Sequence, residues 1–415
     1  MNYTTLWTHL RITLIPVILM ILCPISIHLL VKFGHMHHVN MTWTEIIFGN
    51  VTSWTIVIIM ILWAFLSLIV PAKQYYGATT KSGFTPYYHD NGVLYHVTTS
   101  LLFIVTCYMF PSIPPTIYFN IPHLFSTLNI VALMFCTVLW VKGKYFPTEK
   151  EEPEKTGLIF EFYSGVELHP RIFDVDVKQF MNCRFGMMAW QLLIISYWAV
   201  SYETYGFNWG ITLTVTLQTY YITRFYYIES TYFSSLDVIL DYEGFYMCWG
   251  CLVFMPGFFV YSVYSFVANP PIISQFTALL LLPFGIIFMT LTALVDVEKD
   301  IFKKSNGKRA LWTNNPKFIR AEYEINGKKV TTRLLISGFW GVCRHLNYVF
   351  EIASYVVWSI PGYNLGILPL ACPIFLIILT THRTFRDDDK CLKKYGVAWE
   401  QYCKIVKYKM IPFIF

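Results

Sequence analysis

The chain has 415 residues, of which 55% are hydrophobic and only 13% are charged, and its formal net charge is +6. A soluble globular domain usually carries about 25% charged residues, whereas the mean hydropathy here is +0.49. These values exclude an ordinary water-soluble fold and predict an integral membrane protein. Composition by itself does not indicate whether that protein is an enzyme.

Membrane-spanning helices are predicted wherever about 20 mostly apolar residues can cross the hydrocarbon layer. In chain order the segments that meet this requirement are 12–33, 53–72, 93–112, 121–142, 186–204, 209–228, 243–267 and 273–295. A further apolar stretch, 346–382, is too long for one helix, and Pro361 near its middle would interrupt a helix. We therefore expect a hairpin of two helices there, and about ten spans in total.

The expected fold class is an all-α polytopic membrane protein, because such long continuous apolar runs exclude a β-barrel. Residues 296–334 are expected to form the largest basic loop. Basic residues cluster in segment 296–345 and in the tail after residue 382. Clusters of this kind beside spans mark the cytoplasmic side of a membrane, so the C-terminus is expected to be cytosolic. The same clusters are also suited to docking a phosphorylated ligand. Nucleic acid is not an expected partner, because these charges interrupt a membrane protein instead of forming a basic domain.

Known nucleotide and metal motifs are missing from the sequence. It has no G-x-G-x-x-G, no Walker A sequence and no H-E-x-x-H, so neither a Rossmann site nor a metal centre is predicted. Two C-terminal segments nevertheless combine cations with flat rings. In Leu334–Tyr348, Arg344 can bind phosphate while Trp340 offers a stacking face, and Arg386–Tyr402 has a similar mix with Asp387 as an acceptor. This pattern is typical of a cofactor pocket at the membrane surface.

These two segments resemble the C-terminal signatures of the sterol reductase family. The family pattern is L-L-x-S-G-x-W-G-x-x-R-H-x-N-Y, followed by R-D-D-x-x-C-x-x-K-Y-G-x-x-W-x-x-Y. Further segments resemble the family, and the last two of them resemble its Δ7-reducing branch in particular. These segments are 411–414, 165–172, 182–190 and 244–251.

The resemblance implies a single integral membrane domain, residues 1–415, of ten helices in an endoplasmic-reticulum-type membrane. Residues 1–240 would form N-terminal helices, and 241–415 would form the half that binds NADPH on the cytosolic side together with the sterol. Lys299 and Lys303 would face the 2′-phosphate, and their i, i+4 spacing puts both on one side of a helix. The cofactor residues carried over by position are Lys299, Lys303, Leu335, Trp340, Asn347, Tyr348, Asp387, Cys391, Lys393, Lys394, Tyr395 and Tyr402.

The implied reaction is reduction of a sterol ring double bond, with C7=C8 of 7-dehydrocholesterol-type sterols expected. It needs a hydride from the nicotinamide and a proton from a placed acid. The family has a Tyr three residues after Pro256, where this chain has Phe259. We hypothesise that Asp387 organises the nicotinamide end and that one of three other residues helps to deliver the proton. These residues are Tyr261, Tyr264 and Glu351.

Several alternatives remain open at the level of sequence. Reduction of a Δ14 or a side-chain Δ24 double bond fits the same signatures, and Phe259 also makes a catalytically silent sterol-binding protein conceivable. The membrane would be the endoplasmic reticulum in a eukaryote and a bacterial or host membrane otherwise. The expected partners are a sterol substrate and the lipid bilayer, and the oligomeric state is not predicted.

Overall fold

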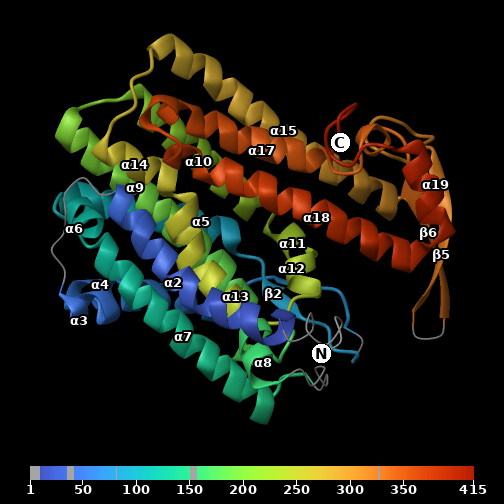
Figure 1. Ribbon diagram of the computed structural model, residues 1–415, viewed down its shortest axis with the longest axis horizontal. Helices are drawn as coiled ribbons and strands as arrows, with labels where there is room; N and C mark the ends of the chain where they lie inside the picture. Colours follow the sequence, from blue (N-terminus) through green and yellow to red (C-terminus); the bar gives the residue numbers. More distant parts are fainter. Residues whose placement is uncertain (1–9, 35–41, 81, 150–156, 326–327) are drawn as a thin grey trace. The chain divides into compact units, whose positions relative to one another are not determined.

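A computed structural model describes residues 10–34, 42–80, 82–149, 157–325 and 328–415 (Figure 1). By packing, the chain divides into two units, Met1–Pro271 and Ile272–Phe415. Each unit packs mainly against itself. The division expected at residue 240 separates N-terminal helices from a half that binds cofactor and sterol, and that division of roles stays a prediction.

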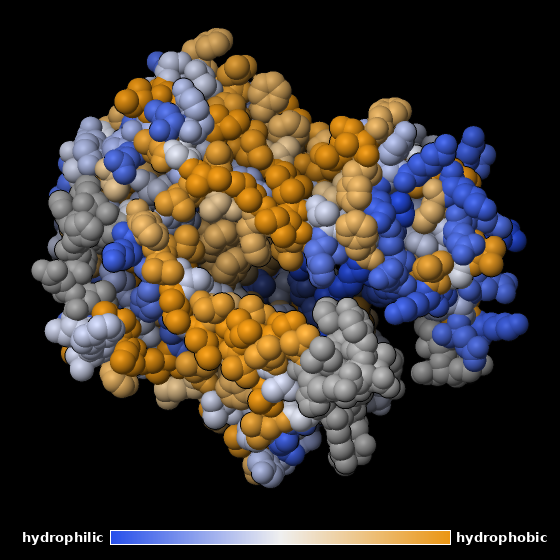
Figure 2. Space-filling view, in the orientation of Figure 1, coloured by the Kyte–Doolittle hydropathy of each residue, from blue (hydrophilic) through white to orange (hydrophobic). Residues whose placement is uncertain are grey.

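Long apolar helices make the protein an integral membrane protein. Within the described residues, six helices are long and apolar enough to span a bilayer, and a pair bent by 41°, Phe245–Phe259 and Tyr261–Ala268, could form a seventh. Apolar side chains on these helices remain exposed, such as Ile59 (60%) and Leu101 (58%), as is expected where a helix faces lipid. Figure 2 shows hydrophobic side chains gathered on the helical surfaces. The six helices are Leu10–Gly34, Trp43–Ile69, Gly92–Met109, Ile121–Tyr145, Gln275–Lys304 and Leu368–Tyr395.

The first unit is a bundle of helices tied together by short antiparallel strand pairs. The segments expected to span at 186–204 and 209–228 form helices α9 and α10, of 19 residues each, which are not among the six. The count of ten spans therefore stays a prediction. The helices are α2 (Ile15–Gly34), α3 (Trp43–Phe48), α4 (Val51–Ile69), α5 (Gly92–Met109), α6 (Ile113–Phe119), α7 (Ile121–Tyr145), α8 (Leu158–Ser164), α9 (Met187–Tyr205), α10 (Trp209–Tyr227), α11 (Glu229–Tyr232), α12 (Leu236–Ile239), α13 (Phe245–Trp249) and α14 (Tyr261–Ala268).

Two of the strand pairs and three π-helical segments complete this unit. The strands are β1 (Gln74–Tyr76) with β2 (Tyr87–His89), and β3 (Arg171–Ile172) with β4 (Val175–Asp176). The π-helical segments are η1 (Leu10–Leu14), η2 (Gln179–Gly186) and η3 (Gly250–Phe259). Long π-helical stretches are rare, and η2 and η3 pack against each other and against α9.

Buried charges at η2 hold the polar loops of the first unit. Arg184 is completely buried and forms an ion pair with Glu229, and it also donates to Asn91 Oδ1 at 2.7 Å. Lys178, 1% exposed, donates to the carbonyl oxygens of Val238 at 2.8 Å and Asp241 at 2.6 Å. Because buried charges are costly unless they are paired, these contacts fix segments 89–91 and 229–241 onto η2.

The second unit is a helical hairpin packed on α15, and it carries a β-ribbon. Helix α17 packs against both α15 and α18, and the chain turns between α17 and α18 through two 3₁₀ segments that include Pro361. The expected hairpin in 346–382 is therefore confirmed. The elements are α15 (Gln275–Lys304), β5 (Phe318–Ile325), β6 (Lys328–Leu335), α16 (Phe339–Val342), α17 (Leu346–Ser359), η4 (Ile360–Leu365), η5 (Leu368–Leu370), α18 (Ala371–Tyr395) and α19 (Val397–Ile405).

One expectation about this unit was wrong. The fold is not entirely α-helical, because the basic segment 296–334 contains the antiparallel pair β5–β6, with Phe318 opposite Leu335. The hydrophilic side chains in Figure 2 gather around this ribbon. Helix α18 continues into the polar tail as far as Tyr395 and ends at Gly396, which has φ +53°. Segment 383–395 contains no glycine or proline, so nothing in it stops the helix.

Candidate functional site

The last turns of α15 hold the turn that follows β6. Glu298 is fully buried, and its carboxylate accepts a hydrogen bond from Phe339 N at 2.8 Å. The indole nitrogen of Trp340 donates to the carbonyl oxygen of Val295 at 2.9 Å. Lys299 Nζ then lies 4.0 Å from the centre of the Trp340 ring, which is within cation–π distance. Two predicted site residues from distant segments are thereby brought together.

Next along the chain, Arg344 fastens the start of α17 to α18. Its guanidinium donates to Asp388 Oδ1 at 2.6 Å and to the carbonyl oxygen of Lys407 at 3.2 Å, and Lys409 approaches the same carboxylate at 3.1 Å. Arg344 is only 6% exposed. In this arrangement its contacts hold the C-terminal segment in place, and the role of Arg344 in binding a cofactor stays a prediction.

Asp387 lies beside a stacked pair of rings. His345 and Tyr348 stack with their ring centres 5.0 Å apart, and His345 Nε2 is 3.7 Å from Asp387 Oδ2. Burial lowers the pKa of His345 to about 4, and the nearby charge of Lys299 acts in the same direction. With this pKa, His345 is neutral at pH 7. At 3.7 Å its ring nitrogen is also too distant from the carboxylate for a normal hydrogen bond.

Asn347 and Cys391 extend this group. Asn347 Nδ2 donates to Asp296 Oδ1 of α15 at 3.1 Å. Cys391 lies one turn after Asp387 on α18, with its sulfur 3.9 Å from Asp387 Oδ2. Asp387, Asn347, Tyr348 and Cys391, all predicted site residues, therefore belong to one cluster with α15.

A second group of rings and cations surrounds the end of α18. Lys394 Nζ lies 4.2 Å from the ring centre of Tyr323 and 5.3 Å from that of Tyr395, and these two rings meet edge to face at 5.6 Å. Tyr402 donates to the carbonyl oxygen of Trp340 at 3.3 Å, which joins this group to the first.

Tyr323 was not among the predicted site residues, because segment 296–334 was expected to be a loop. A signal for it was present in the sequence. The dipeptide Asn326-Gly327 stands between two segments that contain β-branched and aromatic residues, and this arrangement favours a β-hairpin. A hairpin in this segment would have predicted that Tyr323 lies in a strand.

The remaining predicted residues lie at the edges of the cluster or in the first unit. Lys303 lies one turn after Lys299 on α15 and is exposed, Lys393 is exposed on α18, and Leu335 ends β6 in a buried position. Glu351 lies on α17. Tyr261 and Tyr264 belong to α14 of the first unit, where both are buried.

Position 259 holds a packed aromatic ring. Phe259 stacks on Trp190, with ring centres 5.2 Å apart, and also contacts Phe254 edge to face at 5.6 Å. Tyr264 donates to the carbonyl oxygen of Val31 at 3.2 Å. A phenylalanine carries no proton that it could donate, so an acid in this region must come from another residue.

Comparison with known proteins identifies the same family as the C-terminal sequence signatures. The model of the Ergosterol biosynthesis ERG4/ERG24 family matches residues 4–415. The chain is 35% identical over 355 residues to a 7-dehydrocholesterol reductase of Arabidopsis thaliana, covering 85% of this chain and 82% of the relative. It is 33% identical over 386 residues to a 7-dehydrocholesterol reductase of Xenopus laevis, covering 90% and 81%. It is 30% identical over 357 residues to a Delta(14)-sterol reductase of Dictyostelium discoideum, covering 84% and 75%. The chain therefore belongs to the ERG4/ERG24 family of sterol reductases.

Proposed function

We propose that this protein is an NADPH-dependent sterol reductase that reduces a ring double bond, most directly C7=C8 of 7-dehydrocholesterol-type sterols. The observation that carries the proposal is the match of the whole chain to a family whose relatives, at 33–35% identity, are named 7-dehydrocholesterol reductases. The membrane helices also suit a sterol, which dissolves in lipid.

The residues of the second unit fit a dinucleotide with an additional phosphate. Lys299 and Lys303 project from one side of α15, and Lys394 adds a third cation between two tyrosine rings. Cations of this kind suit phosphate groups, and flat rings suit a purine or a nicotinamide. Asp387, with 29% of its side chain exposed, can accept hydrogen bonds from a carboxamide or a ribose hydroxyl. These features favour NADPH as the cofactor.

Saturating an alkene requires that two hydrogens be added. When bound, NADPH supplies one of them as a hydride, and the protein must supply the other as a proton. The residues that we propose for delivering the proton are Tyr261, Tyr264 and Glu351, while Asp387 organises the nicotinamide end. The ring carbon that becomes cationic needs a dry surface with electron-rich faces. Phe245, Trp249 and Phe254 form a chain of neighbouring rings that suits this role.

The proposed location is the endoplasmic reticulum membrane of a eukaryotic cell, or the corresponding bacterial or host membrane. We propose that the C-terminus is cytosolic, together with the basic ends of α15 and α18. The support for this orientation is the excess of lysine and arginine that follows these two spans.

The second candidate is reduction of a Δ14 double bond, which the Dictyostelium relative favours. Purified protein should be given NADPH and separate sterols with Δ7, Δ14 or Δ24 double bonds, and the products identified by mass spectrometry. We expect saturation of C7=C8. Turnover of the Δ14 substrate alone would select the second candidate, and binding of NADPH without any product would indicate a catalytically silent protein.

A further inference from the structure

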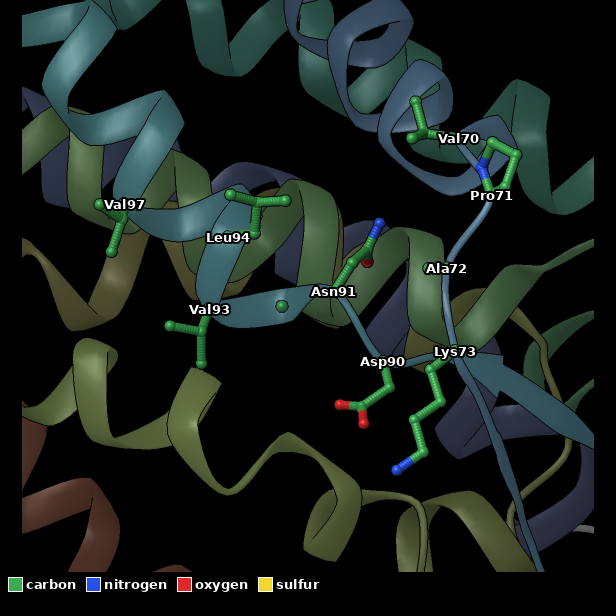
Figure 3. A pocket seen from close by; sticks show the side chains of 10 residues that line it. Val70, Pro71, Ala72, Lys73, Asp90, Asn91, Val93, Leu94 and Val97 are labelled. Carbon is green, nitrogen blue, oxygen red and sulfur yellow. The ribbon is translucent and has the colours of Figure 1, made fainter.

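The connection between α4 and α5 borders an open cavity that none of the proposed catalytic or cofactor residues lines. Its volume is about 640 Å³, and its lining comes entirely from residues 70–73 and 90–97 of the first unit (Figure 3). This volume lies within the range of about 300–1,000 Å³ that is usual for pockets that take small molecules.

One end of the cavity carries two opposite charges. The backbone nitrogen of Asp90 donates to the carbonyl oxygen of Lys73 at 2.7 Å, which continues the β1–β2 pairing, where Gln74 lies opposite His89. The backbone thus sets the two residues side by side. In Figure 3 the Lys73 ammonium and the Asp90 carboxylate both extend on the same side of this strand pair.

The other end of the cavity is apolar. Val93, Leu94 and Val97 lie on the first turns of α5 with 45%, 70% and 44% of their surface exposed, and Val70 at the end of α4 is 57% exposed. Helices α4 and α5 both belong to segments of membrane-spanning character. Their adjoining ends mark the level where hydrocarbon meets water, so the cavity has a polar end in the interface and an apolar wall on its lipid side.

The backbone between these ends is rigidly held. The side chain of Asn91 donates to the carbonyl oxygen of Ser67 at 2.7 Å and accepts from Arg184 at 2.7 Å. Gly92 packs directly against the carboxylate of Glu229, and a β-carbon there would overlap it. The buried Arg184–Glu229 ion pair therefore anchors Asn91 and Gly92, which both line the cavity.

We propose that this cavity binds a 3-hydroxysterol, with the hydroxyl group between Lys73 and Asp90 and the ring system against Val93, Leu94 and Val97. A hydroxyl group both donates and accepts a hydrogen bond, so it matches a carboxylate beside an ammonium. A phosphate group would be attracted to Lys73 but repelled by Asp90, whereas a hydroxyl group can form a hydrogen bond with each of them. The proposal rests on the proposed function for its ligand class, and it adds a binding site at the membrane interface.

The test uses the full-length protein in phosphatidylcholine nanodiscs. The probe is a 3-hydroxysterol with a photoreactive diazirine on its side chain, far from the hydroxyl group, and the labelled residues are mapped by mass spectrometry. We expect label on residues 70–97, displaced by unlabelled 3-hydroxysterol and about tenfold less well by its 3-methyl ether, since a hydrogen bond to a charged group is lost.

Three variants make the result specific. Asp90→Asn and Lys73→Met should each reduce labelling of residues 70–97 several-fold, and Leu94→Trp should block it by filling the apolar end. Glu203→Gln removes an exposed carboxylate from the last turn of α9 in the same unit, and it should label as the unchanged protein does.

Label that is absent from residues 70–97, or that is unaffected by Asp90→Asn and Lys73→Met, would overturn the proposal. Displacement by an anionic phospholipid but not by the hydroxysterol would overturn it in favour of a headgroup site. Sterol turnover is measured on the same samples. Specific labelling without turnover would support this binding site and contradict the proposed reaction. Turnover without labelling would support the proposed reaction and contradict this binding site.

Discussion

At the scale of single residues, the second unit positions its polar groups through a few short contacts. Asp387 lies 3.7 Å from His345 and 3.9 Å from Cys391, and Lys299 lies over Trp340. His345 is uncharged at pH 7 and so does not form a charged pair with this carboxylate. With 29% of its side chain exposed, Asp387 is accessible to a ligand.

Asp387→Asn tests this role. The amide has the same shape but loses the charge and replaces one acceptor with a donor, so we expect sterol turnover to fall by about tenfold or more and NADPH to bind more weakly. Steady-state kinetics and NADPH titration measure the two effects separately. Full turnover at unchanged cofactor affinity would show that Asp387 has no such role.

The buried His345 predicts acid sensitivity. Its pKa falls from 6.5 to about 4 in the folded protein because of burial. Between these two values the unfolded chain binds more protons, so lowering the pH favours unfolding, whereas above about pH 6.5 this residue adds no pH dependence. The apparent melting temperature in detergent should fall between pH 6.5 and 4, and less steeply in His345→Asn. Equal slopes in both proteins would contradict this explanation.

At the scale of elements, tight turns set the helices of the second unit against one another. Gly338 has φ +64° before α16, and Gly396 has φ +53° between α18 and α19. A β-carbon on Gly338 would overlap the carboxylate of Glu298, whereas one on Gly396 would meet open space. Position 338 therefore favours glycine because of its positive φ and because a side chain would overlap Glu298. Position 396 favours glycine because of its positive φ alone.

Gly338→Ala and Gly396→Ala form a matched pair. Both place alanine in a sparsely populated backbone region with positive φ, at a cost of about 1–3 kcal/mol, but only Gly338→Ala also displaces Glu298 from Phe339. We expect Gly338→Ala to lower thermal stability more and to weaken NADPH binding, while Gly396→Ala lowers stability alone. Equal losses of cofactor affinity in the two variants would show that the contact between Glu298 and this turn does not shape the site.

The ion pair behind the α4–α5 connection gives a second prediction at this scale. Arg184→Leu leaves Glu229 buried without its partner, and breaking such a pair costs about 3–5 kcal/mol. The double variant Arg184→Leu with Glu229→Leu removes both charges and should recover most of the loss. Unfolding by dodecyl sulfate in mixed micelles measures both. A double variant no more stable than Arg184→Leu would indicate that packing, not charge, dominates there.

At the scale of the whole molecule, the sequence predicted the membrane character and the family, because these depend on composition and on local signatures. The roles of the site residues stay a prediction. Lys299, Trp340, Asp387 and Lys394 were all predicted, and the second unit brings them into neighbouring groups. The β5–β6 ribbon was missed since its basic residues resemble a solvated loop, and Tyr323 was missed with it. The clamp formed by Arg344 and Asp388 could not be predicted, because either residue alone looks available to a ligand.

The most direct test of the whole account is the origin of the hydrogen added to the sterol. Purified full-length protein should be given 7-dehydrocholesterol and NADPH deuterated at both hydrogens of the nicotinamide C4, and the product analysed by mass spectrometry. The account predicts a product saturated at C7=C8 that carries one deuterium on a ring carbon. A product without deuterium, or no product from any sterol tested, would contradict it.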